Sequence, residues 1–284
     1  MRVLSLGYNG LVTSHNGTSP AAPTSGQLIC GTSTDLSFLD DETVSLVVTS
    51  PPYNVGKDYS KHADDLDLDA YLGFLGAVWT ECMRVLRPGG RLAINVANTW
   101  RRPYIPLSAY IAKQCVDAGW LMRGEVIWDK GASVGVSTAW GSWRSASNPT
   151  LRDVHEYILI FSKDIPKLSA NGEPPDITSE EFTTYTKSVW NFPTASAKRE
   201  GHPAPFPEEL PARLIKLYTF PGDLVLDPFM GTGTTCAAAR RLGRQWVGVD
   251  IDKTYVQLAE KKVAAAIPAV EDEKAAAGSP NPKR

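Results

Sequence analysis

Apolar and polar residues follow two alternating patterns along the chain, one typical of strands and one typical of helices. Short apolar runs predict strands, whereas apolar residues at helical spacing that stop at Gly or Pro predict helices. The predicted strands span 27–30, 44–49, 91–97, 121–128, 154–162, 224–226 and 245–251. The predicted helices span 68–86, 104–118, 208–218, 234–242 and 254–266. This alternation predicts an α/β fold with a doubly wound, mostly parallel sheet.

The periodicity is lost at both ends and in two internal segments. Residues 1–26 are rich in Gly, Ser, Thr, Pro and Asn, which predicts a flexible leader, and residues 265–284 are predicted to form a flexible tail. The segments 131–153 and 164–200 exceed ordinary loop lengths, so we expect them to be functional or disordered insertions. Residues 27–264 are then predicted to form one domain.

Composition places the chain among ordinary globular proteins. Of its 284 residues, 43% are hydrophobic and 21% are charged, and no apolar run approaches the roughly 20 residues that span a bilayer. The N-terminus lacks the apolar stretch of a secretory signal, so a cytoplasmic location is predicted. The four cysteines lack the C-x-x-C spacing of a metal or redox pair, so we expect free thiols and no metal site.

The charge balance does not identify a partner by itself. The formal net charge is −2, but nine bases stand against six acids between residues 98 and 170. A local excess of this size is compatible with contact to DNA and equally with a solvated surface.

A rigid turn follows the strand predicted over 44–49. Its sequence is Ser50-Pro51-Pro52-Tyr53, and two consecutive prolines neither continue a strand ladder nor enter a helix interior. The turn places a hydroxyl group, two tertiary-amide carbonyls and an aromatic ring at the carboxyl end of a strand, where open α/β sheets bind ligands. Acceptors beside an aromatic face suit a planar aromatic amine, and the exocyclic amines of DNA bases are such groups.

A loop with two glycines joins the strand predicted over 224–226 to the helix predicted over 234–242. It reads DPFMGTGTT over residues 227–235, and glycines before a helix N-terminus let the backbone approach a ligand closely. Asp250, at the end of the following strand, is placed to accept hydrogen bonds from ribose hydroxyls. A tight turn or an NAD site would share these features, but the third glycine of the dinucleotide fingerprint is missing. Another adenosine-containing cofactor therefore fits better.

These two segments and three others closely resemble motifs of the β-class DNA amino-methyltransferases. The matching stretches are TSPPY (49–53), LRPGGRL (86–92), HEYIL (155–159), HPAPFP (202–207) and DPFMGTG (227–233). The resemblance covers roughly residues 27–264 and implies a circularly permuted, Rossmann-like methyltransferase sheet whose catalytic half precedes its cofactor half. It also implies S-adenosylmethionine as cofactor and double-stranded DNA as partner, with target-recognition insertions at 131–153 and 164–200, and it is compatible with a homodimer.

The resemblance and the chemistry of the turn together give each candidate residue an expected role. We expect Ser50 and the Pro51 carbonyl to accept the two amine hydrogens, within a turn stiffened by Pro52, and Tyr53 to stack on an extruded base. The expected cofactor-binding residues are Asp227, Pro228, Phe229, Gly231, Gly233, Thr234, Asp250, Thr32, His202 and Phe206. The expected DNA contacts are Arg101, Arg102, Trp143, Arg144, Lys198 and Arg199.

Three positions are interpreted differently from the rest. Thr32 lies in a Gly-Thr-Ser-Thr stretch where the family commonly has Gly-Asp, so the acid that would contact the adenine amino group is absent, unless Asp35 or the Thr32 hydroxyl substitutes. His155 and Glu156 lie at the start of a predicted strand and are interpreted as structural rather than catalytic.

The residue before the two prolines bears on the target base. In this family Ser is more typical of enzymes that act on cytosine N4 and Asp of those that act on adenine N6, so Ser50 favours cytosine, with adenine as the alternative. A catalytically inactive DNA-binding protein and an NAD-dependent oxidoreductase are the alternatives from other classes. A cytosine-C5 methyltransferase is disfavoured because no cysteine follows a proline. Methyl transfer requires that the turn at 50–53 and the loop at 227–233 lie side by side.

Overall fold

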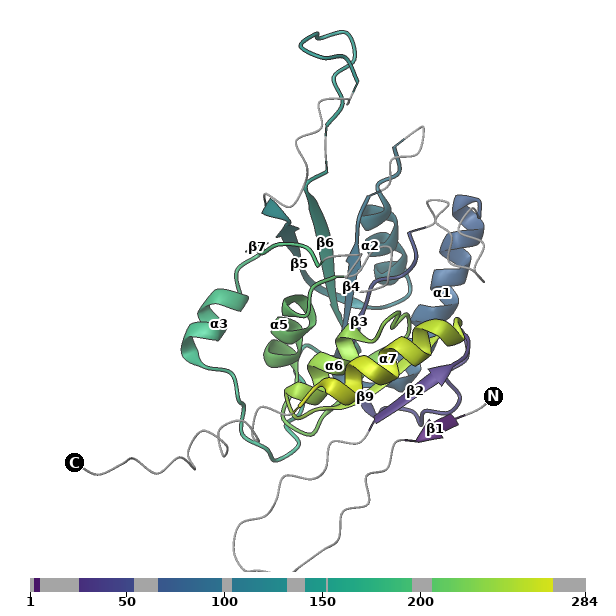
Figure 1. Cartoon of the computed structure of the whole chain (residues 1–284), viewed down its shortest axis with the longest axis vertical. Helices are drawn as coiled ribbons and strands as arrows, with labels where there is room; N and C mark the ends of the chain where they lie inside the picture. Colours follow the sequence, from purple (N-terminus) through teal and green to yellow (C-terminus); the bar gives the residue numbers. More distant parts are fainter. Residues whose placement is uncertain are drawn as a thin grey trace, which may run out of the picture.

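The computed structural model describes residues 3–5, 26–53, 66–98, 104–131, 141–151, 153–195 and 206–267, and its strands form one sheet (Figure 1). The order across the sheet is β1-β2-β9-β8-β3-β4-β6-β5-β7. The strands are β1 (Val3–Ser5), β2 (Gly26–Cys30), β3 (Val44–Thr49), β4 (Leu86–Val96), β5 (Leu121–Asp129), β6 (His155–Ser162), β7 (Val189–Asn191), β8 (Leu224–Asp227) and β9 (Gln245–Asp250). The helices are α1 (Leu68–Val85), α2 (Leu107–Asp117), α3 (Ser179–Tyr185), α5 (Glu209–Tyr218), α6 (Thr234–Arg241) and α7 (Lys253–Ala265).

The pairing within the sheet is mostly parallel. β2, β9, β8, β3 and β4 are consecutive parallel neighbours, and β7 is parallel to β5. β6 runs antiparallel to β4 and β5, and β1 runs antiparallel to β2. The predicted α/β architecture with a mostly parallel sheet is therefore confirmed.

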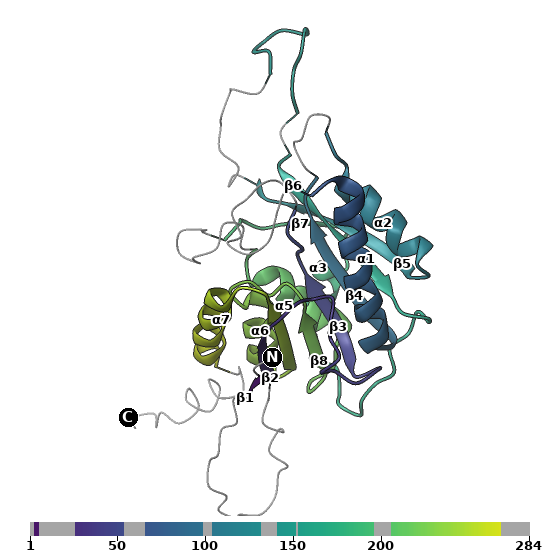
Figure 2. The same cartoon turned by 90° about the vertical axis from the view of Figure 1, so that its right-hand side faces the viewer.

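Helices cover both faces of the sheet, with α1 and α2 on one side and α5, α6 and α7 on the other (Figure 2). Successive strand residues point to opposite faces. Leu46 therefore packs toward α5–α7, whereas Val47 packs toward α1 and α2. Every residue of β3 is buried, as expected for a parallel strand with helices on both sides. No helix in the described part of the chain has the length and apolar character to cross a bilayer.

The described residues contain every strand and helix that the hydrophobic pattern predicts, and three elements that it does not. The additional elements are β1, α3 and β7, which lie in the segments 1–26 and 164–200 where the periodicity is weak. α3 has no buried residue, so it leaves no apolar pattern. Its signal is a capping box, in which the Thr178 side chain accepts from Glu181 N and the Glu181 carboxylate accepts from Thr178 N.

The prediction that residues 87–90 separate a helix from a strand is wrong. β4 begins at Leu86, directly after α1, and residues 87–90 form an irregularity inside the strand, since Val44 pairs with Leu86 while Leu46 pairs with Arg91. Gly89 has φ +78°, and a Cβ there would clash with the Lys167 carbonyl oxygen. The glycine therefore makes a β-bulge over which the chain after β6 can pass closely.

The first part of the segment 164–200 lies at the amino-terminal edge of the parallel strands. Asn171 donates to the Pro221 carbonyl and to Asp223, just before β8. The fully buried Arg244, just before β9, makes two hydrogen bonds of 2.5 and 2.7 Å to Asp176. Both contacts place residues 171–176 at the edge opposite Ser50, so this part of the predicted target-recognition segment is far from the turn.

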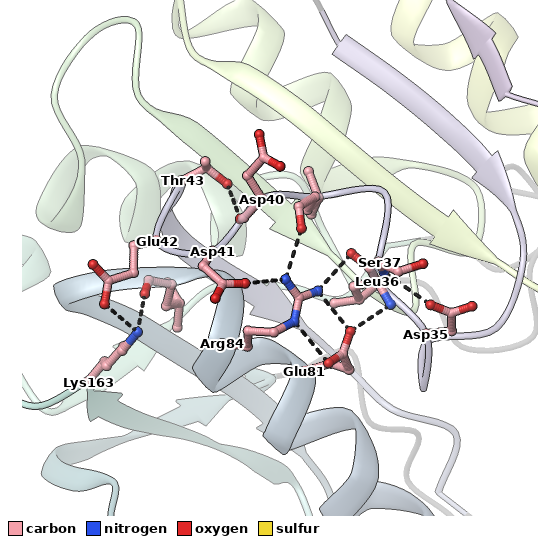
Figure 3. Close-up of polar contacts among 12 residues, drawn as sticks. Asp35, Leu36, Ser37, Asp40, Asp41, Glu42, Thr43, Glu81, Arg84 and Lys163 are labelled. Carbon is pink, nitrogen blue, oxygen red and sulfur yellow. Dashed lines mark hydrogen bonds and ion pairs between the residues drawn. The ribbon is translucent and has the colours of Figure 1, made fainter.

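The loop after β2 is fixed to α1 by Arg84 (Figure 3). The guanidinium donates to the carbonyl oxygens of Leu36 and Leu39, each at 2.9 Å, and pairs with Asp41 at 2.7 Å. Glu81, one turn earlier on α1, accepts from Arg84 and from Leu36 N. Hydrogen bonding to Arg84 lowers the pKa of Glu81 below its ordinary value. The path of a loop that starts at the carboxyl end of β2 is thus set by α1.

The chain leaves the middle of the sheet in two directions. After β8 it crosses through α6 to β9 on one side, and after β3 it crosses through α1 to β4 on the other. The neighbouring carboxyl ends of β8 and β3 therefore form a topological switch point, the position at which open α/β sheets bind ligands.

Candidate active site

The predicted turn and the predicted glycine loop lie side by side at the switch point. Val47 of β3 pairs with Leu226 of β8, so both segments start from the same edge of the sheet. Thr49 Oγ1 donates a hydrogen bond of 2.8 Å to Asp227 Oδ1, across a separation of 178 residues in sequence. The spatial requirement for methyl transfer between the two segments is therefore met.

Asp227 is buried, and both of its carboxylate oxygens accept hydrogen bonds. Besides Thr49, the Phe229 N–H donates to Oδ1 at 3.1 Å, and Thr235 Oγ1 donates to Oδ2 at 2.7 Å. Burial raises the pKa of Asp227 to about 6. The sequence places Asp227 among the cofactor ligands, and its contacts show that it also ties β3, the glycine loop and the start of α6 together.

The Ser-Pro-Pro-Tyr turn is held at several points. Pro51 is buried, and Ser50, Pro52 and Tyr53 are half-buried. Tyr71 of α1 donates from Oη to the Pro52 carbonyl oxygen at 2.7 Å. The Pro52 carbonyl thus accepts a hydrogen bond within the protein. This bond attaches the turn to α1, in addition to the contact between Thr49 and Asp227.

Polar side chains from β4 and β6 surround the turn. Asn95 of β4 is buried, and its Nδ2 lies 2.6 Å from Glu156 Oε2 and 3.2 Å from Tyr53 Oη. Tyr53 Oη donates to Glu156 Oε2 at 3.1 Å and lies 3.0 Å from Ser50 Oγ. Lys130, just after β5, contacts Glu156 Oε1 at 2.5 Å. These five side chains form one connected network at the Ser-Pro-Pro-Tyr turn.

Asp250 lies at the end of β9, beside the glycine loop. Its Oδ2 accepts from Gly231 N at 3.0 Å, and its Oδ1 accepts from Asp252 N at 2.8 Å. Burial raises the pKa of Asp250 to about 6. A carboxylate at the end of the strand that follows the glycine loop is the arrangement that binds ribose in nucleotide-binding βαβ units.

Gly233 and Thr234 begin α6 and also contact α7. Gly233 has φ +80°, and a Cβ on it would lie 2.7 Å from the Ala259 Cβ of α7. Thr234 is buried, and Lys262 Nζ lies 3.0 Å from its Oγ1. Both predicted cofactor residues therefore also hold α6 against α7.

The predicted aromatic contacts lie on opposite sides of the sheet. Phe229 is half-buried, with its ring centroid 5.9 Å from that of Phe74 in α1, at a tilt of 58°. Phe206 is half-buried against the α5–α7 side. The predicted cofactor residue His202 lies outside the described residues.

The loop after β2 also reaches the site. The Gly31 N–H donates to the Asp250 carbonyl at 3.0 Å, and the buried Ser33 donates from Oγ to the Pro228 carbonyl. Thr32 is exposed, and its hydroxyl lies 2.8 Å from the Thr34 hydroxyl. The loop that contains Thr32 thus lies beside Asp250 and the Pro228 carbonyl, and binding of a cofactor by Thr32 and Pro228 stays a prediction.

The candidate DNA contacts are only partly described. Arg101, Arg102, Lys198 and Arg199 lie outside the described residues. Trp143 and Arg144 lie on the loop 141–151, which projects beyond the β5–β6 end of the sheet in both views (Figures 1 and 2). Trp143 is 67% exposed. A bridge between Gly141 and Pro149 and a hydrogen bond from Ser142 N to Asn148 O give the loop a defined turn.

Three residues near the turn have no role that the sequence predicts. Asn95 lies within an apolar strand, Lys130 at a strand end and Tyr71 inside a helix. A polar Asn in an otherwise apolar run is the one visible signal, since a buried polar group needs a partner. Lys130 becomes recognisable only once β5 and β6 are seen to be neighbours, and Tyr71 only once α1 is seen to contact the turn.

A family model described as DNA methylase, of the N6/N4 methyltransferases, matches residues 44–261. The DNA adenine methyltransferase YhdJ of Escherichia coli K12 is 28% identical over 254 residues, covering 82% of this chain and 80% of YhdJ.

Solved structures resemble the whole domain. TTHA0409 of Thermus thermophilus, a putative DNA modification methylase solved with S-adenosyl-L-methionine, is 32% identical, with a TM-score of 0.68 over 85% of this chain and 96% of that one. The cytosine-N4-specific PvuII DNA methyltransferase shares the fold, with a TM-score of 0.69 at 20% identity over 88% of this chain and 90% of that one. With the family match spanning most of its length and both candidate segments, the chain belongs to the N6/N4 DNA methylase family.

Proposed function

We propose that this DNA amino-methyltransferase transfers a methyl group from S-adenosylmethionine to the exocyclic N4 amine of a cytosine extruded from double-stranded DNA. The observation that carries the proposal is the contact between Thr49 and Asp227, which places the Ser-Pro-Pro-Tyr turn beside the glycine loop. A methyl acceptor bound at the turn and a donor bound at the loop are then neighbours.

The residues at the loop suit this cofactor. Asp250 supplies a carboxylate for ribose hydroxyls, and the glycine loop lacks the third glycine that a pyrophosphate-binding loop would carry. Phe229, which is half-buried between the loop and α1, offers an apolar side to an adenine ring or a methionine chain. The cofactor supplies a methyl group on a positively charged sulfur, and the protein supplies position.

The turn prepares the amine for attack. An exocyclic amine is a weak nucleophile because its lone pair is delocalised into the base. Ser50 Oγ and the Pro51 carbonyl accept its two hydrogens, which directs the lone pair toward the methyl group. Holding the two reactants in line and offering preorganised acceptors are the main sources of rate here. The Tyr53 ring stacks on the extruded base, which offsets part of the cost of extrusion.

Cytosine is proposed as the target because a neutral hydroxyl stands before the two prolines. The similarity to the adenine methyltransferase YhdJ favours the same chemistry on adenine N6 as a second candidate. The loop 141–151 carries Trp143 and Arg144 beyond the carboxyl edge of the sheet, which supports its role in DNA contact.

The decisive experiment identifies the product. The purified protein is incubated with unmethylated DNA and S-adenosylmethionine, the DNA is digested to nucleosides, and these are resolved by mass spectrometry. We expect N4-methyldeoxycytidine. N6-methyldeoxyadenosine would move the assignment to adenine, and the absence of any methylated base would overturn the proposed activity.

A further inference from the structure

Glu156 lies at the end of a hydrogen-bond chain that begins at Ser50. Its two carboxylate oxygens are used by three side chains, with Lys130 at Oε1 and Tyr53 and Asn95 at Oε2. The side chains of Glu156 and Lys130 are only 12% and 18% exposed. The position of Glu156 at a strand start indicates a structural role, but this geometry connects it to the atom expected to bind the substrate amine.

The carboxylate fixes the direction of the hydrogen bonds around it. An ionised carboxylate accepts hydrogen bonds and cannot donate them, so Tyr53 Oη and Asn95 Nδ2 must both donate to Glu156. The amide of Asn95 follows the same rule. Its Oδ1 is buried without a hydrogen-bond partner among the described residues. The opposite orientation of the amide is nevertheless excluded, because it would place Oδ1 2.6 Å from the carboxylate oxygen, where two acceptors would repel each other.

The hydrogen bond from Tyr53 to Glu156 also determines which of Tyr53 and Ser50 donates to the other. The phenol has a single hydrogen, and that hydrogen is directed to Glu156 at 3.1 Å. In the contact of 3.0 Å between the two hydroxyl groups, Ser50 must therefore be the donor and Tyr53 the acceptor. Asn95 Nδ2 is a further donor, at 3.5 Å from Ser50 Oγ. Because the Ser50 hydrogen is engaged with Tyr53, Ser50 Oγ offers a substrate only lone pairs.

We propose that Glu156 is a positioning residue that fixes Ser50 as a hydrogen-bond acceptor toward the exocyclic amine of the base. The proposal rests on the proposed function, because it assigns Glu156 a part in activating that amine. Without the carboxylate, Tyr53 can donate to Ser50, and Ser50 then presents its own hydrogen to the amine. The Ser50 hydrogen would then oppose a hydrogen of the amine. The amine could accept a hydrogen bond from Ser50 only by turning its lone pair toward Ser50 and away from the methyl group.

Glu156→Gln tests this most directly, because the amide keeps the shape of the side chain and adds donor hydrogens. We expect single-turnover methylation of DNA to slow by about 10²-fold, which is the scale on which one preorganised hydrogen-bonding group acts in catalysis. We expect the Kd for S-adenosylmethionine to change by less than about twofold, because Glu156 lies on the acceptor side. Glu125→Gln, the same change at an exposed position of β5, is the matched control and should keep the wild-type rate and Kd.

Tyr53→Phe separates positioning from general loss of structure. The variant keeps the ring for stacking and removes the hydroxyl that joins Glu156 to Ser50, which leaves only the long contact of 3.5 Å from Asn95 Nδ2 to Ser50 Oγ. Its methylation rate should therefore also fall by about 10²-fold. In the Tyr53→Phe background, Glu156→Gln should then slow the reaction by less than about threefold. Independent, multiplying losses in the double variant would overturn the proposal, as would a wild-type rate in either single variant.

The outcomes also separate this proposal from the proposed function. If the wild-type protein and the Glu125→Gln control produce no methylated nucleoside, the activity itself is refuted. If they do and Glu156→Gln matches them, only the role of Glu156 is refuted. If Glu156→Gln fails to fold, the methylation rate of Tyr53→Phe still decides. A wild-type rate in that variant would show that the contact from Ser50 through Tyr53 to Glu156 is not needed for turnover.

Discussion

Asp227 and Asp250 stand at the ends of the neighbouring strands β8 and β9, and burial raises the pKa of each to about 6. Both accept backbone N–H hydrogen bonds, which favour the charged form, but the cost of desolvation is larger. The folded, ligand-free protein therefore holds protons on these groups more tightly than the unfolded chain does, and both carboxylates weaken stability as the pH rises from about 4 through 6. A cationic ligand would reverse this balance by favouring the ionised form.

This reasoning predicts that the affinity for S-adenosylmethionine falls as the pH drops below about 6. Protonation of Asp250 removes an acceptor for ribose hydroxyls and a negative charge near a positively charged ligand, and one group changes affinity by at most about tenfold per pH unit. Isothermal titration calorimetry between about pH 5 and 8 measures the effect. Asp250→Asn should bind more weakly at pH 8 and show a flatter profile, and an unchanged profile in that variant would exclude Asp250 as the titrating group.

Ser50→Ala should separate binding from turnover. The hydroxyl lies on the acceptor side, in contact with Tyr53, whereas the cofactor residues lie on the glycine loop and β9. We expect unchanged affinity for S-adenosylmethionine and a loss of about 10²-fold or more in the single-turnover rate, since one preorganised acceptor is removed. Wild-type turnover in Ser50→Ala would remove the serine from the mechanism.

At the scale of elements, the same residues at the start of α6 are predicted to bind the cofactor and also pack against α7. Gly233 adopts φ +80° and lies against Ala259 of α7, and Thr234 is contacted by Lys262 of the same helix. The loop that is expected to hold the cofactor is therefore rigid because α7 supports it from outside.

Gly233→Ala should destabilise the protein through two separable effects. A left-handed backbone costs a residue with a Cβ about 1–2 kcal/mol, and overpacking against Ala259 adds about 1–3 kcal/mol. Gly222 has the same φ of +80° with no atom within 4 Å of the position of a Cβ, so Gly222→Ala carries the first cost alone. Urea denaturation of both variants gives the difference, and equal losses would show that the contact with Ala259 is accommodated without strain.

At the scale of the whole molecule, the two edges of the sheet have different tasks. The carboxyl edge carries the turn and the glycine loop, and the loop 141–151 projects beyond the β5–β6 end of the sheet (Figures 1 and 2). The amino-terminal edge is closed by residues 171–176, which are tied to Asp223 and Arg244. DNA is therefore expected at the carboxyl edge.

Arg144→Ala should weaken DNA binding without affecting the cofactor. If Arg144 contacts a phosphate, the slope of log K against log salt concentration becomes shallower by about one unit. Arg123→Ala is the matched control, because Arg123 is exposed near the amino-terminal start of β5. Fluorescence anisotropy with labelled DNA at several salt concentrations distinguishes the two, and identical slopes for Arg144→Ala and the wild type would exclude this contact.

The central elements could be predicted from the sequence because each one has its own apolar pattern or breaker. β3 is a mostly apolar, fully buried run and α5 is clearly amphipathic, so their positions follow from local sequence. The Pro and Gly of residues 87–90 led to a wrong boundary between helix and strand, because their local sequence is compatible with two structures. Glycine serves in a bulge as well as at a helix end, and only the neighbouring strand β3 and Lys167 distinguish the two.

The candidate site was predictable where one segment carries the chemistry, and not where several segments share it. Ser50 and Tyr53 are close in the sequence, and the glycine loop is continuous. Asn95, Lys130 and Glu156 meet only because β4, β6 and β5 are neighbours in the sheet, and that order departs from the order of the strands along the chain. No local pattern records such a meeting.

The hydrogen bond between Thr49 and Asp227 limits how early the protein can fold during its synthesis on the ribosome. Its two ends are separated by 178 residues, and the second end belongs to the last part of the domain to be synthesised. Closing so large a segment is entropically slow, and it cannot begin until synthesis is nearly finished. During synthesis the Ser-Pro-Pro-Tyr turn therefore emerges long before the glycine loop, and the two segments can meet only after β8 has been synthesised.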